Sequence, residues 1–207
     1  MHVLLLALTA LFVAAPVAAR EVPDRYGNFM MMMAQVQRLD ADLLSRDSAT
    51  ATLQLWCDKY GPGGGAKIVA RRIKGADKAA GKAERRALGV FARTPVAYRR
   101  VELLCGDKVL SEADNWYVPA RLTPAMNTAL EQTQTPFGVV VRPLDFRRRT
   151  LSSELLIGTG ILAHPKPGVL VIPHEVLRHR AVLSTANGRP FSLVVETYTD
   201  QVLIAPP

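Results

Sequence analysis

The chain is poor in residues that bind metals and in aromatic residues. Its 207 residues include two cysteines, four histidines and two tryptophans, and aromatic residues make up 6% of the total. The histidines show no spacing that suits a metal site. They are His2, His164, His174 and His179. We therefore expect no metal ion and no other cofactor.

Motifs that bind phosphates or nucleic acids are also lacking. The glycine run at 61–65 has no Lys-Ser/Thr pair of a phosphate-binding loop, so we interpret it as a flexible turn. No serine lies in a nucleophile elbow. The net charge is +8, but the basic residues are scattered and are not interleaved with the aromatic residues that single-strand binders use. We expect no nucleic-acid partner, and the charge favours small carboxylates or anionic lipid headgroups.

Long apolar runs are scarce, with one exception at the N-terminus. Residues 3–15 are largely apolar, but this run is shorter than the roughly 20 residues that span a bilayer. Small residues at 17 and 19 match the requirement of signal peptidase. We predict a signal peptide over 1–19, cleaved after Ala19, and one exported, periplasmic domain over 20–207 without a stable membrane span. An uncleaved anchor or a buried N-terminal helix is the alternative.

The two cysteines, Cys57 and Cys105, leave two interpretations open. In an oxidising compartment an even number of cysteines is compatible with one disulfide. A disulfide requires Cα atoms within about 4–7 Å, and the sequence does not give that distance. The alternative is a pair of small buried hydrophobic residues.

The hydrophobic pattern predicts an α+β fold. A core-facing helix is expected to begin near Asp47-Ser48, since both are good N-caps. Its apolar residues recur at helical spacing, and they are Leu53, Trp56, Cys57 and Tyr60. Turn signals at 106–108 and 187–188 join long strands into hairpins. Strands joined in this way, with helices segregated between them, indicate a single antiparallel sheet with helices packed against it.

Further elements follow from the same patterns. We expect helices over 29–38 and 124–133, the second capped by Thr123, and an exposed helix or loose basic loop within 75–89. Residues 137–141 are expected to be extended, and 147–149 form a basic segment. Strands are expected at 66–73, 96–105, 109–118, 169–172, 177–183 and 191–203.

Alternation along two strands suggests a candidate site. In 96–105, Arg100 shares a face with Tyr98 and Glu102, while Arg99 shares the other face with Val101 and Leu103. Glu196 lies in an apolar stretch of the last strand, where a carboxylate needs a cation or hydrogen-bond donors. Arg100 is our candidate partner, because a guanidinium offers a forked set of donors. The alternatives are a structural ion pair or two independent surface residues.

Four short segments, in their order and spacing, resemble the chorismate pyruvate-lyase family. They are Asp47-Ser48-Ala49-Thr50, the strand segment 98–105, Thr135-Pro136-Phe137-Gly138 and the strand segment 194–198. The similarity covers about residues 39–203. It implies the chorismate lyase-like fold and a cofactor-free elimination of pyruvate from chorismate that gives 4-hydroxybenzoate.

The resemblance also implies roles for particular residues. Arg100 occupies the place of the family's carboxylate-binding arginine, and Glu196 that of a glutamate that assists proton movement. Both are thus the predicted catalytic residues, and both bind substrate. Phe137 corresponds to a backbone contact with the ligand, Arg149 to a second arginine, and Ala49 to a ligand-contacting methionine. These three complete the predicted substrate-binding set.

Three functions remain open at this stage, because Ala49, Val101 and Asn115 depart from the family pattern. The first is a chorismate lyase. The second is an exported, non-catalytic protein that binds a small aromatic or enolic carboxylate, since bacterial regulators use the same general fold as an effector-binding domain. The third is a structural or envelope-interaction protein. We expect a monomer whose partner is a small-molecule carboxylate.

Overall fold

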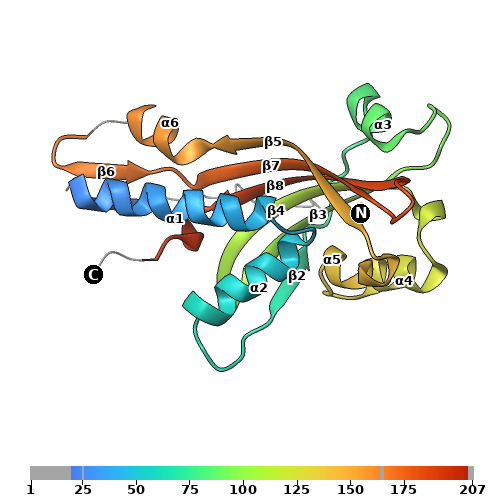
Figure 1. The fold of residues 1–207 in the computed structure, drawn as a ribbon, viewed down its shortest axis with the longest axis horizontal. Helices are drawn as coiled ribbons and strands as arrows, with labels where there is room; N and C mark the ends of the chain where they lie inside the picture. Colours follow the sequence, from blue (N-terminus) through green and yellow to red (C-terminus); the bar gives the residue numbers. More distant parts are fainter. Residues whose placement is uncertain (1–19, 25, 164–165, 205–207) are drawn as a thin grey trace, which may run out of the picture.

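A six-stranded antiparallel sheet forms the centre of the computed structural model, which describes residues 20–24, 26–163 and 166–204 (Figure 1). The predicted signal peptide lies outside the described residues. Hairpins join β3 to β4 and β7 to β8 at the predicted turns. The α+β class and the antiparallel pairing are therefore confirmed. In spatial order the strands are β2 (Ile68–Arg72), β3 (Ala97–Cys105), β4 (Lys108–Tyr117), β8 (Pro190–Thr199), β7 (Glu175–Ser184) and β5 (Arg147–Leu155).

The prediction of a single sheet is only approximately right, because two strands pair separately. β1 (Arg20–Pro23) and β6 (Val169–Ile172) form a small antiparallel sheet of their own. Pro173 separates β6 from β7, and a proline has no backbone N–H to donate to a sheet. The chain therefore leaves one sheet before it enters the other.

Helices cover the two faces of the large sheet unequally. α1 (Tyr26–Leu44) and α2 (Ala49–Tyr60) bury apolar residues against one face, whereas α3 (Lys82–Leu88) packs Leu88 on the other (Figure 1). No helix in the described ranges is long and apolar enough to cross a membrane. The remaining helices are α4 (Pro124–Gln132), α5 (Phe137–Val140), α6 (Leu156–Ala163) and the 3-10 helices Pro119–Arg121, Arg142–Leu144 and Asp200–Val202.

Helix starts and core-facing residues follow the sequence closely. The Ser48 hydroxyl accepts the Ala51 N–H at the start of α2, and the Thr123 hydroxyl accepts the Met126 N–H at the start of α4, each at 3.2 Å. Such caps satisfy backbone donors that the helix itself leaves free. The predicted apolar stripe of α2 lies in or against the main core. Both helices were therefore correctly located.

Three segments differ from the prediction. Residues 137–141, expected to be extended, form the short helix α5, because Phe137 and Val140 pack on a core cluster that outweighs the strand preference of the valines. The basic segment 147–149 begins β5. The last strand ends at Thr199, whose hydroxyl caps the 3-10 helix Asp200–Val202.

A disulfide between Cys57 and Cys105 resolves the question that the sequence left open. It joins α2 to the end of β3 across 48 residues, and the two Cα atoms are 5.8 Å apart. Gly61 lies against it: a Cβ atom at this position would be 2.6 Å from Cys105 Sγ and 2.3 Å from the Cys57 carbonyl oxygen. Only glycine therefore fits beside the bridge.

Removing this disulfide should destabilise the protein substantially. For a loop of this length, loop-closure entropy predicts a loss of about 4 kcal/mol in the free energy of unfolding. We expect a Cys57→Ser/Cys105→Ser variant to unfold at markedly lower denaturant concentration than the oxidised wild type, with a larger m-value because the denatured chain without the bridge exposes more surface. Equal midpoints for the variant and the wild type would show that the bridge contributes no stability.

Candidate ligand-binding site

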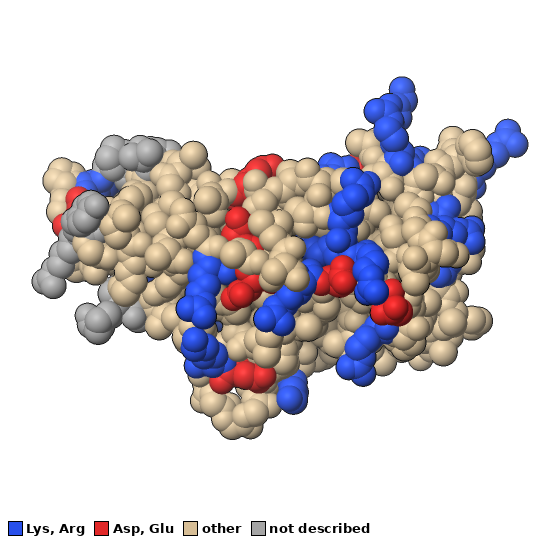
Figure 2. Space-filling model, viewed as in Figure 1, with Lys and Arg blue, Asp and Glu red and all other residues tan. Residues whose placement is uncertain are grey.

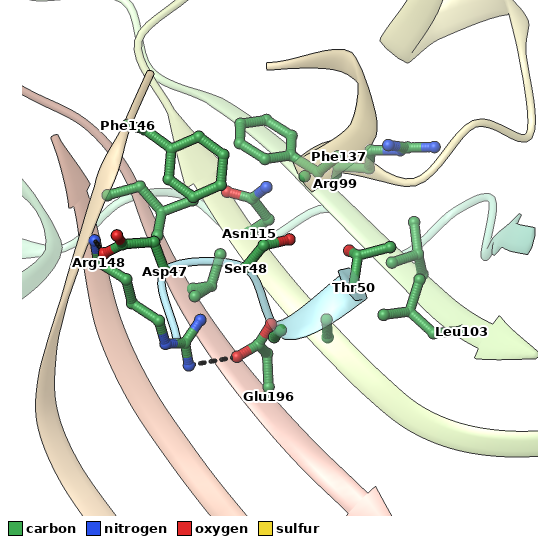
Figure 3. A pocket seen from close by; sticks show the side chains of 16 residues that line it. Asp47, Ser48, Thr50, Arg99, Leu103, Asn115, Phe137, Phe146, Arg148 and Glu196 are labelled. Atoms are coloured by element: carbon green, nitrogen blue, oxygen red, sulfur yellow. Dashed lines mark hydrogen bonds and ion pairs between the residues drawn. The ribbon is translucent and has the colours of Figure 1, made fainter. Parts of the chain in front are cut away.

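A pocket opens between the covered face of the sheet, the start of α2 and the segment from α5 to Phe146 (Figure 3). It holds about 510 Å³ of space between atoms, open solvent at the mouth included. Its walls are formed by Asp47, Ser48, Ala49, Thr50, Arg99, Val101, Leu103, Ala113, Asn115, Phe137, Gly138, Phe146, Arg148, Leu183, Val194 and Glu196.

The register of three neighbouring strands brings the floor of the pocket together. Val101 of β3 lies opposite Ala113 of β4, which lies opposite Glu196 of β8. Asn115 and Val194 form the next pair along the same face. Since side chains alternate between faces, every second residue of these strands points into the pocket.

An ion pair between Arg148 and Glu196 closes one side of the pocket. Arg148 Nη2 donates to Glu196 Oε2 at 2.6 Å, and the two side chains are only 3% and 9% exposed (Figure 3). The Tyr198 hydroxyl donates to the same oxygen at 3.3 Å. Although burial alone would lower the pKa of Arg148, the Glu196 carboxylate raises it above its ordinary value. Arg148 thus compensates the negative charge of Glu196.

Further, partly buried polar contacts support this ion pair. The Asp47 carboxylate accepts the backbone N–H of Arg148 at 2.7 Å and so ties β5 to the start of α2. Behind Tyr198, the ring of His179 makes an edge-on contact with the tyrosine, and its Nε2 lies 2.7 Å from Asp40 Oδ1 in α1. Burial, followed by the Glu196 charge, raises the pKa of Tyr198 well above its ordinary value. The Tyr198 hydroxyl therefore stays protonated and remains a hydrogen-bond donor to Glu196.

Arg99 lies on the opposite side of the pocket and has no carboxylate partner among the described residues (Figure 3). The residue is 2% exposed. Its Nη2 donates to the Thr135 carbonyl at 3.4 Å, while Nε and Nη1 have no hydrogen-bond acceptor within the described ranges. Burial, and then the nearby Arg72 charge, lower its pKa. A buried cation in this state is costly unless an anion completes it.

Apolar and hydrogen-bonding groups lie between these two sides. The aromatic rings of Phe137 and Phe146 face the pocket near Asn115 (Figure 3). Asn115 Oδ1 accepts the buried Ser192 hydroxyl at 2.7 Å, which fixes the orientation of the amide. Gly138 packs close to the start of α2, where an added Cβ would be 3.0 Å from the Thr50 hydroxyl. The pocket thus combines a cation, an amide and aromatic walls.

The structure separates the predicted pair Arg100 and Glu196. Arg100 lies on the other face of the sheet, where its Nη2 bonds Glu112 Oε2 at 2.9 Å. The reason is register: Val101, and not Arg100, is aligned with Ala113 and Glu196. Arg99 therefore occupies the pocket position that we had given to Arg100.

Of the other predicted site residues, some line the pocket and one does not. Ala49 and Phe137 line the pocket, as does Glu196. Arg149 does not: Arg148 precedes it, shares a face with the pocket residue Leu183, and points inward in its place. A usable signal existed for Arg99, because it alternates with the apolar residues Val101 and Leu103, whereas Arg100 alternates with polar ones.

A relative at high identity was found for the chain. No protein-family model matches it. It is 46% identical over 184 residues to y4mC, an uncharacterized protein of Sinorhizobium fredii, and the alignment covers 84% of this chain and 77% of y4mC. The chain belongs to the y4mC family.

Similarity to solved structures was found at low sequence identity. PhnF from Mycobacterium smegmatis superposes with a TM-score of 0.51 at 11% identity over 77% of this chain, and the chain spans 66% of the length of PhnF. YydK, a possible transcriptional regulator of Bacillus subtilis, gives 0.43 at 11% identity over 69% of this chain and 63% of its own. The similarity to PhnF shows a shared fold, and it agrees with the predicted fold of the lyases and of regulator effector-binding domains.

Proposed function

We propose that this member of the y4mC family binds a small aromatic or enolic carboxylate in the pocket beside Arg99. The observation that carries the proposal is the buried guanidinium of Arg99, which has two N–H groups without acceptors among the described residues. A ligand carboxylate in the pocket would supply the missing negative charge beside this guanidinium. Arg148 also has an Nε without an acceptor, but Glu196 already compensates its charge.

The walls of the pocket support an aromatic or enolic body for this ligand. Phe137 and Phe146 offer ring faces, and Leu103 and Val194 add apolar surface. The Ser48 and Thr50 hydroxyls and the Asn115 amide provide hydrogen-bonding groups for a ring hydroxyl or an enol ether. Such a site, mostly apolar with a few polar groups, is typical of pockets for small molecules.

Binding without turnover fits the state of Glu196 best. One of its oxygens, Oε2, accepts hydrogen bonds from both Arg148 and Tyr198, so this oxygen is occupied by protein donors. A general acid, in contrast, has to present its proton to the substrate. The mutual compensation of charge between Arg148 and Glu196 therefore favours a binding protein.

Chorismate lyase activity is the second candidate function, and the position of Glu196 favours it. The carboxylate comes from the last strand and lines the same pocket as a buried arginine, as the resemblance to the lyases implies. Here Arg99 would hold a substrate carboxylate and Glu196 would assist proton movement as pyruvate leaves. The oriented pocket would supply most of the rate increase, since orientation alone lowers barriers by several kcal/mol.

We propose further that the mature domain works outside the cytosol. The buried Cys57–Cys105 disulfide supports this, because such bridges persist mainly in oxidising compartments. The apolar stretch and small residues of 1–19 support it independently.

Thermal unfolding of residues 20–207 with and without 4-hydroxybenzoate tests the proposal. At a ligand concentration 100 times its Kd, stabilisation of about 2.7 kcal/mol should raise the Tm by about 5–10 °C. The neutral amide 4-hydroxybenzamide is the matched control and should raise it far less. Equal shifts with acid and amide would exclude a carboxylate site. Incubation with chorismate distinguishes the candidates: released pyruvate identifies the lyase, and protection without pyruvate identifies the binding protein.

A further inference from the structure

Phe91, next to α3, is the most exposed large hydrophobic side chain in the described part of the protein. It is 88% exposed, whereas the other exposed large hydrophobic residues described do not exceed 50%. An aromatic side chain left almost wholly in water loses the free energy that its burial would provide. We therefore expect another surface to cover this side chain.

The turn that carries Phe91 is held in one shape. Arg85 Nη1 donates to the carbonyls of Phe91 and Thr94, both at 2.9 Å, and the Thr94 N–H donates to the Phe91 carbonyl at 3.1 Å. Gly89 ends α3 in the left-handed region, with φ of 59°. Phe91 is therefore presented at the tip of an ordered turn.

This turn is anchored to the sheet face opposite the ligand pocket. Leu88 is fully buried against Trp116, Val182 and Leu193. Arg121 Nη1 donates a hydrogen bond to the Leu88 carbonyl oxygen at 2.7 Å. Strand alternation places Trp116 and Leu193 on the opposite face from Asn115 and Val194, which line the pocket. Contacts made through Phe91 therefore leave the pocket accessible.

Exposed basic residues flank Phe91 along the chain. Lys82, Arg86 and Arg93 are exposed, and none of them forms a salt bridge with a described residue. The acidic residue of α3, Glu84, is engaged by the Gly81 N–H and by Arg180. Lys and Arg side chains project outward in the region of α3, at the upper right of the molecule (Figure 2). An exposed aromatic group among unpaired cations is complementary to an anionic, partly apolar surface.

We propose that the Phe91 turn binds the surface of an anionic lipid bilayer. Lysines and arginines are attracted to anionic headgroups, and an amphipathic or aromatic side chain enters the boundary between headgroups and acyl chains. A protein partner is less suited to this region, because a stable interface buries about 800 Å² on each side, and here one apolar side chain protrudes from a convex turn. The domain would thus lie on the membrane with its pocket facing away.

Co-sedimentation with lipid vesicles tests the proposal with the full mature domain. We expect binding to vesicles of phosphatidylcholine with 30% phosphatidylglycerol, and none to phosphatidylcholine alone. Phe91→Ser should weaken binding about tenfold. The matched control is Leu55→Ser, since Leu55 is 50% exposed on α2 at the other face and should not matter. Arg86→Gln/Arg93→Gln should weaken binding as well, and high salt should release the protein.

Several results would overturn the proposal. Binding that is equal for neutral and anionic vesicles would exclude charge recognition, and no binding to either would exclude the membrane. Wild-type affinity in Phe91→Ser would mean that the aromatic tip makes no contact. Binding to soluble polyglutamate as strong as to vesicles would identify an acidic protein as the partner. Circular dichroism and Tm of each variant establish that it is folded, and the loss of vesicle binding should leave the response to 4-hydroxybenzoate unchanged.

Discussion

Replacing Arg99 by methionine should abolish most of the affinity for carboxylates and leave the protein folded. The guanidinium is buried and has no carboxylate partner in the described structure, so a bound anion would be its principal compensation. Charge-assisted hydrogen bonds of this kind contribute about 2–4 kcal/mol, which corresponds to a loss of roughly 30- to 1,000-fold in affinity. Titration calorimetry of the two proteins with 4-hydroxybenzoate measures this loss.

Stability gives a second readout of the same substitution. Removing a buried, uncompensated charge in favour of an apolar side chain of similar length is often neutral or stabilising. Arg99→Met should therefore unfold at the same denaturant concentration as the ligand-free wild type, or at a higher one. Arg100→Met is the matched control: Arg100 is the next residue and pairs with Glu112 on the other face, so affinity should stay unchanged. If Arg100→Met lost the ligand and Arg99→Met kept it, the assignment of the pocket arginine would be wrong.

Replacing Arg148 by methionine should destabilise the protein severely. The substitution leaves the Glu196 carboxylate buried with only the Tyr198 hydroxyl as a donor. Breaking one partner of a buried ion pair costs about 3–5 kcal/mol. Equilibrium urea unfolding of Arg148→Met should show a loss of this size.

A double substitution separates charge from packing in this prediction. Arg148→Met/Glu196→Leu removes both charges and should recover most of the stability lost in Arg148→Met, because apolar replacement of a whole buried pair is tolerated. If the losses in the free energy of unfolding from the two substitutions simply added, the double variant would be less stable than Arg148→Met. The two residues would then be acting independently. The ion pair would then not be the reason for the loss.

Much of the fold was predictable because it depends on local patterns. The stripe of Leu53 and Trp56 and the cap at Ser48 define α2, and turn residues define the hairpins. The separate pairing of β1 with β6 was not predictable, because it joins segments almost 150 residues apart through short strands with little pattern of their own. The helix at Phe137–Val140 depends on packing against distant strands, which outweighs local preference.

The arginines that line the candidate pocket were predictable to within one residue on two strands. Spacing from the Leu103-Leu104-Cys105 motif selected Arg100, and spacing past Phe137 selected Arg149, whereas Arg99 and Arg148 line the pocket. A shift of one residue along a strand moves a side chain to the other face, so motif spacing alone cannot choose between neighbouring arginines. The choice requires the pairing between strands, which is a property of the folded chain. Apolar alternation around Arg99 was the available local clue.

A crystal structure of the mature domain with 4-hydroxybenzoate tests the central claim most directly. We expect the ligand in the pocket of Figure 3, with its carboxylate on the side lined by Arg99 and its ring against Phe137 or Phe146. The Arg148–Glu196 pair should remain intact. A ligand bound elsewhere, or one that turns its carboxylate to Arg148 and displaces Glu196, would contradict the claim.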